Sequence, residues 1–70
     1  MTTVQIENID ASNRFVKVSV LNSQGVLAGY AWIGADAVVH RVENWQLKQR
    51  IDIRAHAERF ARRAAVALSR

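Results

Sequence analysis

Hydrophobic and polar residues alternate along the first half of the chain, and this alternation predicts β-structure. In an extended chain Val16, Val18 and Val20 point one way, and the residues between them, with Phe15, point the other. Turn-forming residues at 10–13 and 22–25 bound this segment on both sides. We therefore expect three strands of an antiparallel meander, over residues 3–9, 14–21 and 26–33.

After the third predicted strand, the period of the pattern changes towards that of a helix. Val38 and Val42 follow at helical spacing, and Asp36 is a suitable N-cap residue. We expect a helical region over about 36–69, formed by one or two helices. An alternative interpretation makes 38–42 a fourth strand, because β-branched residues are dense there.

The C-terminal segment, residues 50–70, has the pattern of an amphipathic helix with Asp52 as its cap. Its apolar stripe consists of Ile53, Ala57, Phe60, Ala61, Ala64, Ala67 and Leu68. The opposite side carries Arg59, Arg62 and Arg63. The predicted fold class is therefore α+β: a three-stranded antiparallel β-meander followed by one or two C-terminal α-helices packed on the sheet.

The two faces of the middle strands differ in chemistry. One face presents the valines, and the other presents Phe15, Lys17, Tyr30 and Trp32. Pairing about the 22–25 loop predicts Lys17 opposite Tyr30 and Phe15 opposite Trp32. Aromatic rings beside a lysine suit the stacking of nucleic-acid bases, but aromatic side chains are equally typical of a core beneath helices. The face that the helices cover decides between these interpretations.

The composition predicts one small domain, residues 1–70, with a modest hydrophobic core. The chain has no cysteine, so no disulfide can stabilise it, and we expect association into a homo-oligomer. The net charge of +4 divides into −1 over residues 1–40 and +5 over residues 41–70. This asymmetry indicates nucleic acid or an acidic protein surface as the partner. Arginines that only solubilise a helix are the alternative.

The sequence contains no motif that we interpret as catalytic, so we expect no enzyme activity. Two Asp-x-x-x-His pairs, Asp36 with His40 and Asp52 with His56, have residue types that bind metals. Because each aspartate is also the expected cap of a helix, we predict no metal, no cofactor and no small-molecule substrate. No apolar run approaches the roughly 20 residues of a membrane span, so we expect no membrane contact and a cytoplasmic location.

We expect a small non-enzymatic regulatory protein that engages nucleic acid through an arginine-rich C-terminal helix. The alternative is an inhibitor or adaptor that binds an acidic surface of a host protein complex. In size and in its Ala/Arg-rich composition, the chain resembles small phage and mobile-element proteins, some of which inhibit host machinery. A structural homodimer is the third hypothesis. The candidate binding residues are Arg59, Arg62, Arg63, Arg54, Arg50, Lys48, Arg41, Lys17, Tyr30 and Trp32.

Overall fold

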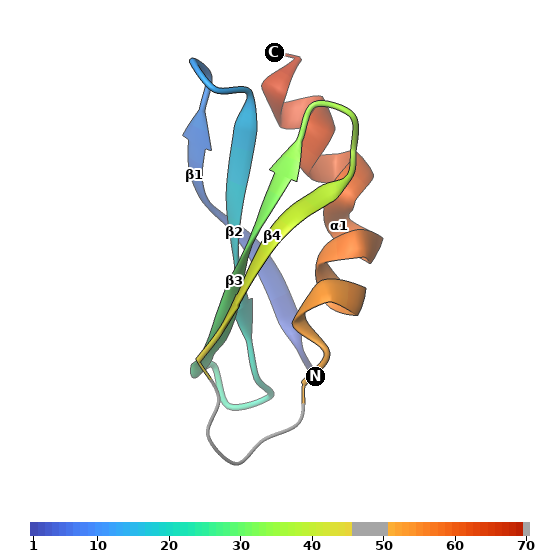
Figure 1. Cartoon of the computed structure of the whole chain (residues 1–70). Coiled ribbons are helices and arrows are strands. Elements are labelled where there is room, and N and C mark those ends of the chain that lie inside the picture. The colour runs from blue at the N-terminus through green and yellow to red at the C-terminus, as the bar shows by residue number, and fades with distance from the viewer. Residues whose placement is uncertain (46–50, 70) are drawn as a thin grey trace.

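A four-stranded antiparallel sheet carries a C-terminal helix on one of its faces (Figure 1). The structure, a computed structural model, describes residues 1–45 and 51–69. Its elements are β1 (Thr3–Asp10), β2 (Phe15–Leu21), β3 (Leu27–Gly34), β4 (Val39–Asn44) and α1 (Ile53–Leu68). Neighbouring strands pair in chain order, so the sheet is a meander. The predicted α+β class is confirmed, but the sheet has four strands and not three.

The core lies between α1 and the valine face of the sheet. Its buried residues include Val16, Val18, Val20, Ile33, Ile53, Ala57, Ala61 and Ala64. Alanines at helical spacing leave little bulk between helix and strands, so α1 approaches the sheet closely. A Cβ atom added to Gly29 of β3 would collide with the carbonyl oxygen of Glu43 and lie 3.1 Å from Cδ1 of Ile53. Glycine is therefore required where β3 passes beneath the start of α1.

The pairing of β2 with β3 differs from the predicted register by two residues. Lys17 lies opposite Trp32, and not opposite Tyr30 as predicted. The loop extends one residue further than expected, with the N–H of Asn22 donating to the carbonyl of Val26 at 2.8 Å. A β-bulge near the start of β3 adds the second residue. A shift of two keeps every side chain on its predicted face, because side chains alternate with a period of two.

The segment that we expected to begin the helical region is a strand, β4, as the alternative interpretation proposed. Val39 is buried in the core and pairs with Ile33, and its carbonyl accepts a hydrogen bond from Nη1 of Arg54 at 3.1 Å. Asp36 is therefore not a helix cap. Its carboxylate instead accepts the backbone N–H of Val38 at 3.1 Å, in the turn before β4. The β-branched valines fit the extended backbone, and pairing with β3 satisfies its hydrogen bonds.

Helix α1 begins at the predicted cap. The Asp52 side chain accepts the backbone N–H of Ala55 at 3.0 Å, which satisfies one of the free donors of the first turn. The predicted helical residues at 46–50 lie outside the described residues. No helix in the described part of the chain has the length and apolarity needed to cross a membrane.

Candidate functional site

The first candidate surface is a groove between the N-terminal residues and α1, which we call the basic groove. Its lining residues are Met1, Thr2, Thr3, Val4, His56, Arg59, Phe60 and Arg63. Its volume is about 550 Å³. Side chains three or four positions apart on a helix share one side, which brings His56, Arg59 and Arg63 to the same wall. None of these lining residues is acidic, and Arg59 and Arg63 give the groove two fixed positive charges.

The arginines of this helix surface are free to bind an anion. Arg59, Arg62 and Arg63 are exposed, and no salt bridge holds any of them within the described part of the chain. Glu58, which the helical spacing places near Arg62, is not paired with any of these three arginines either. The guanidinium of Arg63 lies 5.6 Å from the ring centroid of Phe60. This cation–π contact orients the side chain without neutralising its charge.

The other basic residues of the predicted site lie elsewhere. Arg54 donates to the Val39 carbonyl of β4, so it links α1 to the sheet, and it does not line the basic groove. Lys17 and Arg41 lie on the face of the sheet that α1 does not cover. Lys48 and Arg50 fall outside the described residues. The structure therefore separates the predicted binding residues into two surfaces.

The second candidate surface is the uncovered face of the sheet, which we call the aromatic face. It carries Phe15, Lys17, Tyr30 and Trp32, and all four side chains remain partly exposed. Trp45 extends the row, with its side chain 62% exposed and its ring edge-on to Tyr30 at 6.3 Å. The helix thus covers the valines, and the aromatic residues are not the core. This answers the question that the sequence left open.

Two β-bulges add side chains to the aromatic face at the edges of the sheet. In β4 the extra residue is His40, so His40 and Arg41 both turn towards this face. The His40 ring lies edge-on to Phe15, with centroids 5.4 Å apart. In β1 the extra residue is Glu7, which joins Asn8 on the same face. Each bulge places two consecutive residues on one side of a strand.

Cations lie against the rings of this face. Nζ of Lys17 is 4.0 Å from the centroid of Tyr30 and 5.5 Å from that of Trp32. The guanidinium carbon of Arg41 is 4.8 Å from the Trp32 ring, and its Nη2 also pairs with Glu43 at 3.3 Å. The structure therefore brings four of the predicted binding residues, Lys17, Tyr30, Trp32 and Arg41, into one cluster.

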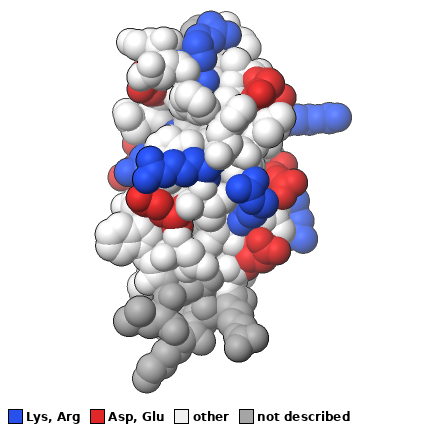
Figure 2. Space-filling model, viewed as in Figure 1, with Lys and Arg blue, Asp and Glu red and all other residues white. Residues whose placement is uncertain are grey.

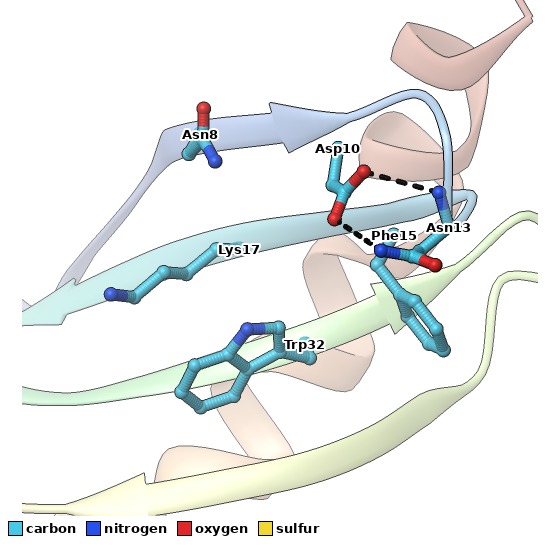
Figure 3. Close-up of a pocket in the computed structure, with 6 residues that line it drawn as sticks. All are labelled: Asn8, Asp10, Asn13, Phe15, Lys17 and Trp32. Atoms are coloured by element: carbon cyan, nitrogen blue, oxygen red, sulfur yellow. Dashed lines mark hydrogen bonds between the residues drawn. The ribbon is translucent and has the colours of Figure 1, made fainter.

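A hollow of about 330 Å³ opens on the aromatic face over β1, β2 and β3 (Figure 3). Its lining residues are Asn8, Asp10, Asn13, Phe15, Lys17 and Trp32. The carboxylate of Asp10 accepts the backbone N–H of Asn13 at 3.1 Å and its side-chain amide at 2.9 Å. These bonds, the side-chain bond most strongly, lower the pKa of Asp10 below its ordinary value. The hollow therefore contains an ionised carboxylate at neutral pH.

Carboxylates outnumber fixed cations on the described part of the aromatic face. They belong to Glu7, Asp10, Asp36 and Glu43. The cations are Lys17 and Arg41. Asp36 bonds His40 at 3.0 Å over Gly34, and this bond lowers the pKa of Asp36. On the side of the molecule shown in Figure 2, basic and acidic side chains intermingle without forming a field of one sign.

Sequence reasoning missed residues on both surfaces. Phe60 was assigned to the apolar stripe, and His56 was not placed with the arginines. The spacing of His56, Arg59 and Arg63 on a helical wheel is the signal that connects them. Asp10 and Asn13 were assigned only to a turn, because nothing in the sequence locates the bulge in β1 that sets their position over the sheet.

Within the described residues, no three histidine, aspartate or glutamate side chains gather in a way that could hold a metal ion. Comparisons with protein-family models, with curated proteins and with solved structures find no significant match to this chain. We therefore infer function from the geometry and chemistry of the two surfaces alone.

Proposed function

We propose that this chain is a small non-enzymatic regulatory protein that binds nucleic acid through the basic groove and the adjoining arginines of α1. One observation carries the proposal: exposed arginines without salt-bridge partners line a groove that has no acidic residue. Guanidinium groups pair with phosphate oxygens in a two-pronged geometry, so Arg59 and Arg63 can contact phosphates along a backbone. Arg62, next to them on the helix, adds a third cation.

The rest of the groove suits the less polar parts of a nucleotide. Phe60 and Val4 offer apolar surface to a sugar or an unpaired base, while Thr2 and Thr3 offer hydroxyl groups. Contacts of this type fix the position of a strand but do not read its sequence. We therefore expect binding that depends on charge and on strand form more than on base identity.

The test is fluorescence anisotropy with labelled single-stranded RNA, single-stranded DNA and duplex DNA over a series of salt concentrations. With three phosphates neutralised, affinity should fall roughly 20- to 40-fold between 50 and 200 mM salt. Binding that is absent for all three probes, or that does not change with salt, would contradict the proposal.

A matched pair of variants localises the site. Arg59→Gln with Arg63→Gln removes two cations from the groove and should weaken binding by about tenfold or more. The control is Arg14→Gln with Arg41→Gln, which changes the net charge by the same amount at described positions that do not line the groove. Equal losses in both double variants would indicate that only net charge matters.

A second candidate function is an inhibitor or adaptor that places the same arginines on an acidic protein. Val66, 52% exposed on α1, interrupts the basic surface, and mixed apolar and basic surfaces are typical of protein interfaces. A pulldown from lysate treated with nuclease separates the two functions. Capture of a specific protein that the Arg59→Gln/Arg63→Gln variant loses would favour this candidate.

The third candidate, a homodimer, is favoured by apolar residues on the edge strand β1. Ile6 and Ile9 are 39% and 45% exposed, on the side of the sheet that carries α1. An edge strand with such residues offers backbone groups and apolar area to a second copy. Light scattering at micromolar concentration tests this directly, and a monomer would exclude it.

A further inference from the structure

The hollow on the aromatic face contains a carboxylate with acceptor capacity to spare. Asp10 accepts hydrogen bonds from the backbone N–H and the amide of Asn13, and from the backbone N–H of Ser12. All of these donors are uncharged, and a carboxylate has about four lone-pair positions, so acceptor capacity remains. Within the described residues, no cation forms a salt bridge with Asp10.

The apolar components of the hollow are two aromatic rings. Phe15 and Trp32 belong to neighbouring strands, and both line the hollow. The residue opposite Phe15 is Gly34, and the Asp36 and His40 side chains lie over it. In Figure 3 the side chain of Lys17 extends along its strand away from Phe15 and Asp10. Its ammonium nitrogen lies over the Tyr30 ring, 4.0 Å from the ring centroid. The space between the rings and the carboxylate is thus accessible to a ligand.

The charges around the hollow favour a cation over an anion. The aromatic face carries more carboxylates than fixed cations, so a phosphate group is repelled there and a positive group is attracted. Each of the other carboxylates on this face has a partner of its own: Ser19 for Glu7, His40 for Asp36 and Arg41 for Glu43. Among these carboxylates, Asp10 is the one that lines the hollow, and its hydrogen-bond donors are uncharged.

We propose that this hollow binds the arginine side chain of a partner protein, with the guanidinium group paired to Asp10 and stacked on Trp32. A guanidinium is planar, so it presents two parallel N–H groups to the two carboxylate oxygens while its face rests on a ring. The side-chain oxygen of Asn8, which also lines the hollow, can accept one of its remaining N–H groups. A lysine ammonium has neither the planar face nor the paired donors.

This binding is independent of the basic groove, which lies on the helix side of the sheet. The two surfaces prefer ligands of opposite charge. An experiment can therefore disprove nucleic-acid binding without disproving arginine binding, and it can disprove arginine binding without disproving nucleic-acid binding. Neither site uses a residue of the other.

The test uses nuclear magnetic resonance of the ¹⁵N-labelled chain with three capped peptides: Gly-Arg-Gly, Gly-Lys-Gly and Gly-citrulline-Gly. The arginine peptide should shift the Trp32 indole N–H and the amides of Asn8 and Asn13. The lysine peptide should bind at least about fivefold more weakly than the arginine peptide, because lysine lacks the two-pronged geometry. Citrulline keeps the shape without the charge and should give no saturable shift. Equal shifts with all three peptides, or no shifts with any, would overturn the proposal.

Asp10→Asn removes the charge at nearly constant shape and should reduce the affinity for the arginine peptide by about tenfold. Glu58→Gln, which removes one acid from the far side of the molecule, is the matched control and should leave it unchanged. If Asp10→Asn disturbs the turn, the arginine and citrulline peptides on the unmodified chain still test whether the site requires a charged guanidinium.

Guanosine monophosphate is the competing probe, because its base has a similar donor edge. Tighter binding of this nucleotide than of the arginine peptide would overturn the proposal.

Discussion

The basic groove and the aromatic face belong to one small sheet, yet they treat charge in opposite ways. In the groove, arginines stand exposed without carboxylate partners. On the aromatic face, carboxylates outnumber fixed cations, and the cations lie against aromatic rings. The net charge of +4 therefore describes neither surface. The position of α1 separates these charges, because α1 carries the arginines and leaves the aromatic rings uncovered.

The largest expected effect abolishes both surfaces together. Gly29→Val forces a side chain into the Glu43 carbonyl and the Ile53 side chain, where β3 passes under α1. We expect a loss of at least about 3 kcal/mol in the free energy of unfolding, which is much of the stability of so small a core. Urea denaturation measures it. An unchanged midpoint would mean that α1 does not pack against the sheet as described.

The next effect should separate the surfaces. Arg59→Gln with Arg63→Gln is expected to weaken nucleic-acid binding by about tenfold or more and to leave the arginine-peptide shifts unchanged. Both residues are exposed on α1, so circular dichroism should show an intact fold. Loss of both ligands with an intact fold would show that the surfaces are coupled.

A smaller effect should reach the groove but not the aromatic face. Asp52→Ala removes the hydrogen bond to the N–H of Ala55 and should lower stability by about 1 kcal/mol. The first turn of α1 precedes His56, so amide exchange should increase there. Exchange in β2 should stay slow, and an equal increase in both elements would argue against local fraying.

The smallest effect concerns pH and involves the aromatic face alone. The folded chain lowers the pKa of Asp36, chiefly through the bond to His40, below its ordinary value of 3.8. Such a group contributes stability above that value, and the contribution is lost as the pH falls through the lower, folded-state pKa. We therefore expect the melting temperature to fall below pH 3.8 and the fall to be shallower in Asp36→Asn. An identical pH profile for the two chains would contradict this.

Lowering the pH should also affect the two ligands differently. Asp10 must be ionised to bind an arginine side chain, so that binding should disappear in the acidic range where Asp10 gains a proton. Arginine keeps its charge throughout, so the groove should retain its affinity for phosphate wherever the chain stays folded. The measurement is a titration with each ligand at pH 7 and at the lowest pH that preserves the fold. It compares the change in affinity at the two surfaces.

Several parts of this structure could be predicted from residue patterns. The alternating residues of β2 predicted a strand with two chemically different faces, and Asp52 predicted the start of α1. The fourth strand could not be decided, because Val38 and Val42 fit a helical period and an extended strand equally well. Local pattern was ambiguous there, and pairing with β3 resolved it.

The choice of the covered face was also beyond the sequence, since both faces of the sheet carry apolar residues. In the structure, the alanine stripe of α1 fits closely on valines and Gly29, where aromatic rings would hold the helix further away. The bulges that bring Glu7 and His40 to the aromatic face leave no mark in the hydrophobic pattern. Asn8, Asp10 and Asn13, the residues of the hollow near the bulge in β1, were therefore missed.

We propose that one chain carries two separate surfaces for ligands of opposite charge. The most direct measurement is a two-ligand titration, in which the ¹⁵N-labelled chain is saturated with a single-stranded RNA probe and then titrated with the arginine peptide. We predict that RNA shifts the resonances of Arg59 and Arg63, that the peptide shifts those of Asn13 and Trp32, and that both bind at once. Displacement of one ligand by the other, or shifts that fall on the same residues, would contradict the account.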